Sequence, residues 1–120
     1  MPDVSRGEVW LVDLPQGRGH EQEGTRPAVI VLDLRGHNTA VIVPTTKELA
    51  TERFSHVYTI MPSKENGLDR ESVAQAYQIQ TITKERFIHK MGKLNAADID
   101  AVMGIIANML KLEKPKAEPN

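Results

Sequence analysis

Two short apolar runs near the N-terminus, separated by a Gly-rich polar segment, constrain the fold of this chain most. Val, Trp and Leu dominate residues 8–14, and Ala, Val and Ile dominate residues 28–32. β-Branched and aromatic residues favour strands, and short runs that are apolar at nearly every position are typical of strands buried on both faces. The chain is therefore expected to begin with two strands joined by a long loop.

Further strand-like segments follow at short intervals. Residues 39–43 are expected to form a hairpin with residues 28–32 through a turn at 35–38, and Pro44 is expected to end this third strand. After a polar stretch, the pattern predicts a fourth strand over 56–61, a turn over 62–68, an extended polar segment over 72–82, a tight turn or single helical turn over 83–86 and a last strand over 87–94.

One helix is predicted near the C-terminal end. Asn95 is a favoured N-cap residue, and Asp98 can meet the free amides and the dipole of the first turn. Apolar residues then recur at helical spacing, namely Ile99, Val102, Met103, Ile106, Met109 and Leu110. Because this stripe needs a sheet to cover, five to six strands and one helix predict a mainly β fold, a small curved sheet or barrel with the helix packed on it.

Length and composition predict one domain over residues 1–112, followed by a charged, Pro-containing tail over 113–120 that is expected to be disordered. The chain has no cysteine, no apolar run near the roughly 18 residues needed to cross a bilayer, and no secretory-signal pattern at its start. A soluble cytoplasmic protein without a membrane partner is therefore expected. The net charge of -1 excludes a broad positive field, so any basic surface must be local.

The segment 16–25 contains three glycines and ends at the strongest candidate for chemistry, Arg26. A loop this long in a small domain is usually functional or mobile. Arg26 precedes the rigid Pro27, and its planar guanidinium matches the geometry of phosphate or carboxylate. The alternative is a structural arginine paired with Glu21 or Glu23.

Three other residues are candidates with ordinary alternatives. Thr46, at a strand end, can donate a hydrogen bond to a phosphate oxygen or simply cap a turn. Glu21 and His20 share the loop with Arg26, so either can serve as a general base or be a solvated loop residue. The histidines are scattered and no HExxH motif occurs, which makes a metal site unexpected. The lack of GxxxxGK and GxSxG motifs disfavours nucleotide hydrolysis and acyl transfer.

The order of motifs in this chain resembles the MazF/PemK family of toxin endoribonucleases. The resemblance runs from Arg6 to Leu112 and is carried by RGEVWLVDL, GHEQEGTRPAVIV, VPTT, NGLDRESVAQAYQIQTITKERF and MGKL before a terminal helix. It implies an SH3-like small β-barrel of the CcdB/PemK type with a C-terminal helix. It also implies a homodimer with a groove at or near the interface.

The same resemblance implies sequence-specific cleavage of single-stranded RNA without a metal or other cofactor. The ribose 2′-hydroxyl attacks the adjacent phosphate and leaves 2′,3′-cyclic phosphate and 5′-hydroxyl ends. The family's loop arginine falls on Arg26, its catalytic threonine or serine on Thr46 and its loop glutamate on Glu21. Arg26 and Thr46 would act as fixed donors to the charged phosphorane, and Glu21 or Arg26 would assist proton transfer.

RNA-binding roles are expected for a second group of residues, His20, Gln22, Thr45, Lys47 and Gln78. His20 stands where many relatives carry Ser, which places an additional titratable group near the expected site. The expected protein partner is a cognate MazE-like antitoxin, whose disordered acidic C-terminal segment folds across the toxin and occupies the RNA groove.

Two other functions are compatible with a barrel of this kind. A CcdB-like toxin poisons DNA gyrase without being an enzyme, by binding it through the terminal helix. The presence of Arg26 and Thr46 disfavours that alternative. The third hypothesis is an inactive SH3-like interaction module.

Overall fold

The computed structural model describes residues 3–15 and 24–112, which form seven strands and one α-helix. The strands are β1 (Glu8–Leu14), β2 (Gly24–Leu34), β3 (Thr39–Thr46), β4 (Val57–Ile60), β5 (Ser72–Gln75), β6 (Gln80–Thr83) and β7 (Phe87–Lys93), and the helix is α1 (Ala96–Met109). Short 3-10 helices lie between them: η1 (Arg35–His37), η2 (Leu49–Arg53), η3 (Ala76–Gln78) and η4 (Lys84–Arg86). The predicted mainly β fold with one C-terminal helix is confirmed.

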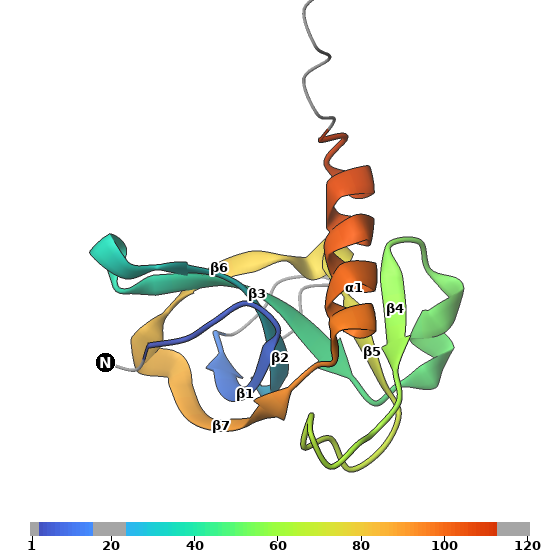
Figure 1. The fold of residues 1–120 in the computed structure, drawn as a ribbon, viewed down its shortest axis with the longest axis horizontal. Coiled ribbons are helices and arrows are strands. Elements are labelled where there is room, and N and C mark those ends of the chain that lie inside the picture. The colour runs from blue at the N-terminus through green and yellow to red at the C-terminus, as the bar shows by residue number, and fades with distance from the viewer. Residues whose placement is uncertain (1–2, 16–23, 113–120) are drawn as a thin grey trace, which may run out of the picture.

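The strands form one antiparallel, strongly curved sheet with α1 beside it (Figure 1). The strand order is β4-β5-β3-β2-β1-β7, and β6 also pairs with β3. No helix among the described residues is both long and apolar enough to cross a membrane.

Strand β3 is longer than predicted, because Pro44 does not end it. The strand continues to Thr46, and Pro44 pairs with Ala28 of β2. On the other edge of β3, residues 39–42 pair with β6, whereas residues 45 and 46 pair with β5. Proline has no amide hydrogen to donate to a neighbouring strand. Pro44 therefore lies where β3 changes partners, and the strand carries two threonines beyond it.

Two hydrophobic clusters form the core and use alternate residues of β2. Val29 and Val31 belong to the cluster that α1 covers through Val102 and Ile106. Ala28 and Ile30 belong to a second cluster on the other face, with residues of β1, β3 and β6. Side chains of a strand alternate between faces, so burial of both faces explains why residues 28–31 of β2 are all apolar.

Helix α1 begins as predicted, with Asn95 as N-cap. The Asn95 side chain accepts a hydrogen bond from the Asp98 amide at 2.8 Å. The Asp98 carboxylate accepts a hydrogen bond from the Tyr58 hydroxyl at 2.5 Å and so ties α1 to β4. The expected apolar stripe is confirmed except at its end, since Leu110 is 51% exposed. A residue at the helix terminus has no strand beneath it.

Several other predicted boundaries shift. The extended segment 72–82 is interrupted by η3, and β2 starts at Gly24 instead of Ala28, so two residues assigned to the loop belong to the sheet. The predicted helical turn at 83–86 is η4, capped by the Thr83 hydroxyl, which accepts from the Glu85 amide. The predicted disordered tail, 113–120, lies outside the described residues.

Candidate functional site

A groove with a volume of about 570 Å³ lies where the start of β2 meets the end of β3. One side carries Arg26 and Pro27 from β2 with Thr45 and Thr46 from β3, and the groove extends to Gly67 and Asp69 in the segment between β4 and β5. The structure thus brings Arg26 and Thr46, which the sequence predicted as the catalytic pair, into one depression. They come from adjacent antiparallel strands, so the sheet sets their relative position.

The backbone at the end of β3 anchors the Arg26 side chain. Nη1 of Arg26 donates a hydrogen bond to the carbonyl oxygen of Thr45 at 3.2 Å, and the Thr45 hydroxyl donates to the carbonyl oxygen of Pro27 at 2.8 Å. Thr45 is 2% exposed, so its hydroxyl is committed to joining the two strands. These bonds hold the guanidinium beside the residue that precedes Thr46.

Thr46 is half-buried in the groove and its hydroxyl is oriented by the following turn. The Thr46 oxygen accepts a hydrogen bond from the amide of Glu48 at 3.2 Å, and none of the described residues accepts one from the hydroxyl. A threonine hydroxyl has one donor and two acceptor positions. The hydroxyl therefore keeps a hydrogen with which to bind an oxyanion in the groove.

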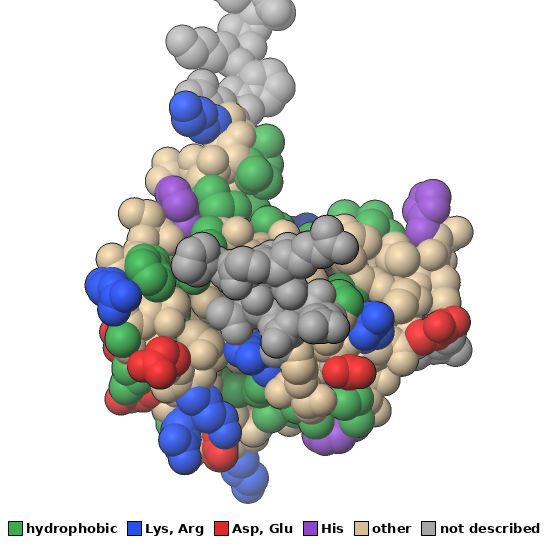
Figure 2. Space-filling model, turned by 180° about the vertical axis from the view of Figure 1, so that it is seen from behind, with side chains coloured by type: hydrophobic (Ala, Val, Ile, Leu, Met, Phe, Trp, Pro, Cys, Tyr) green, Lys and Arg blue, Asp and Glu red, His purple; other side chains and the backbone are tan. Residues whose placement is uncertain are grey.

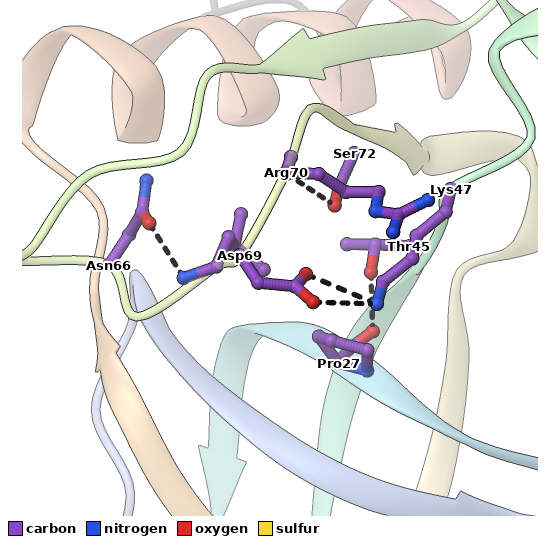
Figure 3. A network of polar contacts seen from close by, with 8 residues as sticks. Pro27, Thr45, Lys47, Asn66, Asp69, Arg70 and Ser72 are labelled. Carbon is purple, nitrogen blue, oxygen red and sulfur yellow. Dashed lines mark hydrogen bonds and ion pairs between the residues drawn. The ribbon is translucent and has the colours of Figure 1, made fainter.

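An ion pair joins the two sides of the groove (Figure 3). Nζ of Lys47 lies 3.1 Å from Oδ1 and 3.1 Å from Oδ2 of Asp69. The hydrogen bond from Lys47 lowers the pKa of Asp69 below its ordinary value, so the carboxylate is charged at neutral pH. Lys47 was expected at this site, whereas Asp69 was not.

A second missed residue, Asn66, shapes the turn that presents Asp69. Its side-chain oxygen accepts from the amides of Ser63 and Leu68, each at 3.0 Å, and its side-chain nitrogen donates to the carbonyl oxygen of Met61 at 2.9 Å. Asn66 is 2% exposed. The signal in the sequence was the Asn-Gly pair, which predicted a turn here but not the burial of the asparagine.

Charges of both signs are interspersed on the surface around these elements. On the face drawn in Figure 2, Lys and Arg side chains alternate with Asp and Glu side chains. This agrees with the net charge of -1 and with the expectation that positive charge is local. The described residues that line the groove include two cations, Arg26 and Lys47, and two carboxylates, Asp69 and Glu48.

One further predicted site residue, Gln78, does not line this groove. Gln78 lies in η3 and lines a separate apolar pocket of about 410 Å³, together with Phe54, Ser55 and Tyr77. The Phe54 and Tyr77 rings meet edge to face there, with centroids 6.2 Å apart. The predicted residues His20, Glu21 and Gln22 lie outside the described residues.

No group of three or more His, Asp or Glu side chains that could hold a metal ion occurs within residues 3–15 and 24–112. Among the described residues, those that line the groove carry a guanidinium, threonine hydroxyls, an ammonium and two carboxylates. Such a set can bind and polarise a phosphodiester through hydrogen bonds and charge.

Comparison with known proteins identifies the family of the chain. Residues 5–110 match the model of the PemK-like, MazF-like toxins of type II toxin-antitoxin systems. The chain belongs to this family. MazF9 of Mycobacterium tuberculosis, named an endoribonuclease, is 34% identical over 104 residues, which span 80% of this chain and 86% of the relative.

Solved MazF structures share the fold of this chain. A crystal structure of MazF from Deinococcus radiodurans matches with a TM-score of 0.75 and 19% identity, over 91% of this chain and 97% of that one. An endoribonuclease from a mycobacterial species, solved in complex with its cognate antitoxin, matches with a TM-score of 0.67 and 24% identity, over 94% and 100% of the two chains. The predicted MazF/PemK-type fold is thus confirmed.

Proposed function

We propose that this protein is an endoribonuclease toxin that cleaves single-stranded RNA at specific sequences without a metal ion. The observation that carries the proposal is the convergence of Arg26 and Thr46 on one groove. Membership of the MazF-like family and 34% identity to a MazF endoribonuclease support it. RNA cleavage of this kind would take place in the cytoplasm.

The proposed reaction takes its nucleophile from the substrate. The ribose 2′-oxygen attacks the adjacent phosphorus, the bond from phosphorus to the 5′-oxygen breaks, and the products carry a 2′,3′-cyclic phosphate and a 5′-hydroxyl. Negative charge develops on the non-bridging oxygens of the phosphorane. We assign Arg26 and the Thr46 hydroxyl as donors to these oxygens, because both line the groove. Fixed donors lower the barrier because they need no reorganisation.

Two proton transfers accompany this reaction. The 2′-hydroxyl loses a proton to a base and the departing 5′-oxygen gains one from an acid. We assign these transfers to Glu21 and Arg26, in either order. Thr45 is proposed to act through Arg26, since its own hydroxyl is bonded to Pro27 and its carbonyl oxygen holds the guanidinium.

RNA binding beyond the reacting phosphate is assigned to Lys47 in the groove and to Gln78 at the apolar pocket. The Phe54 ring in that pocket is 46% exposed, which suits stacking with a base. His20 and Gln22 are proposed to contribute from the loop before β2. These contacts would supply the sequence preference, because base edges and stacking distinguish one RNA from another.

The proposed partners are a second copy of this chain and a cognate MazE-like antitoxin. The mycobacterial neighbour of this fold was solved with its antitoxin bound. An acidic antitoxin segment would complement Arg26 and Lys47 and so occupy the RNA groove. Co-expression with a cognate antitoxin should then inhibit cleavage. Light scattering of the toxin alone should give the mass of a dimer.

The decisive experiment is cleavage of a defined single-stranded RNA by purified protein in excess EDTA, followed by analysis of the new ends. Cyclic phosphate and 5′-hydroxyl ends at a small set of sequences are expected. Arg26→Ala protein, prepared identically, excludes a contaminating nuclease. Intact RNA with wild-type protein, together with binding to DNA gyrase, would favour the CcdB-like alternative; loss of activity in EDTA would refute the metal-free mechanism.

A further inference from the structure

The ion pair between Lys47 and Asp69 bridges the groove at the site proposed to bind RNA. Lys47 is the first residue after β3 and directly follows Thr46, whereas Asp69 precedes β5. One ammonium group meets both carboxylate oxygens of Asp69, at 3.1 Å each (Figure 3). In the substrate-free protein, Asp69 therefore neutralises the charge of Lys47 in the groove where Lys47 is proposed to bind an RNA phosphate.

The turn that precedes Asp69 is fixed by hydrogen bonds and by close packing. The buried Asn66 side chain bonds three backbone groups of the turn before Asp69. Gly67 has φ +73°, and a Cβ at this position would lie 2.2 Å from the carbonyl oxygen of Met91, so the turn packs tightly on β7. Lys47, in contrast, carries its charge on a flexible four-carbon chain. Lys47 is thus the partner that can move.

Both ends of the ion pair are accessible to water, with side-chain exposures of 47% for Lys47 and 68% for Asp69. Exposed ion pairs are weak because water and salt screen them. A phosphodiester also carries a full negative charge and offers oxygen acceptors to an ammonium group. The ion pair is therefore strong enough to position Lys47 and weak enough for a phosphate to replace Asp69 as the partner of Lys47.

We infer that Asp69 holds Lys47 in the empty groove and that an RNA phosphate displaces the Asp69 carboxylate from Lys47 when the substrate binds. The inference rests on the proposed function and adds a step to its binding reaction. Asp69 is a positioning residue in this scheme, since it touches Lys47 and not the reacting atoms. By competing with phosphate, it weakens binding of RNA.

The test measures binding of a labelled, single-stranded 2′-O-methyl RNA pool, which cannot be cleaved because it lacks the attacking hydroxyl. Asp69→Asn is expected to tighten binding roughly twofold to fivefold, the range that corresponds to an exposed ion pair. Glu71→Gln is the matched control, because it removes the same charge two residues away without altering a residue that lines the groove. It should change binding less than Asp69→Asn.

A double-mutant cycle separates competition for Lys47 from general repulsion of RNA. In a Lys47→Met background, the gain from Asp69→Asn should fall to that of Glu71→Gln. Equal effects of Asp69→Asn and Glu71→Gln, a gain that persists without Lys47, or weaker binding by Asp69→Asn would each overturn the inference. The ion pair itself is checked without RNA, since Lys47→Met should raise the NMR-measured pKa of Asp69 toward its ordinary value.

The outcomes also separate this inference from the proposed function. Wild-type protein that cleaves RNA, with no difference between Asp69→Asn and Glu71→Gln, leaves the endoribonuclease assignment intact and removes the exchange step. Wild-type protein that neither binds nor cleaves RNA refutes both.

Discussion

Arg26 donates a hydrogen bond from Nη1 to the carbonyl oxygen of Thr45 at 3.2 Å, which fixes its guanidinium at the end of the neighbouring strand. Because β2 and β3 are antiparallel, the start of one strand lies beside the end of the other. The bond therefore crosses between two segments that are distant in the chain but adjacent in the sheet. It places the cation of β2 and the hydroxyl of Thr46 on one groove, as the proposed reaction requires.

Replacement of Arg26 by Ala should abolish detectable cleavage or slow it by at least about 100-fold, a loss typical of removing one donor to a developing oxyanion. The rate is measured with a fluorogenic RNA under single-turnover conditions. Arg35→Ala is the control, since it removes an equal charge in η1, just beyond the far end of β2, where the side chain is 72% exposed. Unchanged cleavage by Arg26→Ala would contradict the assignment.

Two substitutions of Thr46 should distinguish the effect of its hydroxyl on cleavage from the effect of its side-chain shape. Thr46→Val keeps the shape and should slow cleavage roughly 10- to 100-fold, because a hydrogen bond to a charged group contributes about 1.5–3 kcal/mol. Thr46→Ser keeps the hydroxyl and should retain most activity. Thermal unfolding should differ little among the three proteins, and equal rates for Val and Ser would assign Thr46 to the local turn alone.

Two glycine-to-alanine substitutions should have opposite effects on stability. Gly67→Ala should destabilise the protein by more than about 1 kcal/mol, because φ is +73° and the new Cβ would meet the carbonyl oxygen of Met91. Gly104→Ala, in α1, has no atom within 4 Å of the new Cβ and should stabilise by up to about 1 kcal/mol. Urea unfolding measures both, and a stabilising Gly67→Ala would show that the turn can relax.

Loss of the buried Lys84 should make stability less dependent on pH. Nζ of Lys84 lies 2.6 Å from Oδ1 of Asp33, and both side chains are at most 9% exposed. The hydrogen bond from Lys84 lowers the pKa of Asp33 below its ordinary value of 3.8. The contribution of this ion pair to the free energy of unfolding is therefore present above pH 3.8 and is lost as the pH falls through the lower pKa of the folded state.

Lys84→Met should therefore cost about 3 kcal/mol at pH 7, because it leaves a largely buried carboxylate without its main partner. The cost should shrink as the pH falls through the lowered pKa of Asp33. Lys90→Met is the matched control, since Lys90 pairs with Glu8 but is 49% exposed; it should cost at most about 1 kcal/mol at pH 7. Urea unfolding at several pH values provides the comparison. A cost for Lys84→Met that is the same at pH 7 and at low pH would contradict the role of the ion pair.

The local signals in the sequence predicted local structure well. The bounds of β1 and the N-cap at Asn95 were correct, because strand preference, helical spacing and capping depend on residues close together in the chain. Pro44 misled the prediction because its effect depends on which neighbouring strand lies beside it. That neighbour is set by the pairing of β3 with β5 and β6.

The residues of the candidate site were also predicted only in part. Arg26 was singled out from its chemistry, and its pairing with Thr46 was implied by the family resemblance; the structure places both in the groove. Asp69 was missed, since a charged residue in a turn is ordinarily solvated and nothing nearby in sequence indicates a pairing with Lys47. Gln78 was placed in the same set as Lys47, but η3 directs it to a different pocket.

By itself, the sequence determined which segments become strands or helix and which side chains are chemically able to bind a phosphate. Only the tertiary structure decided that the Thr45 hydroxyl joins two strands, that the Thr46 oxygen accepts from the Glu48 amide beside the groove, and that Lys47 pairs with Asp69. The physical reason is distance along the chain. Backbone preferences act over a few residues, whereas the pairing of β2, β3 and the segment before β5 depends on burial and hydrogen bonding across the whole sheet.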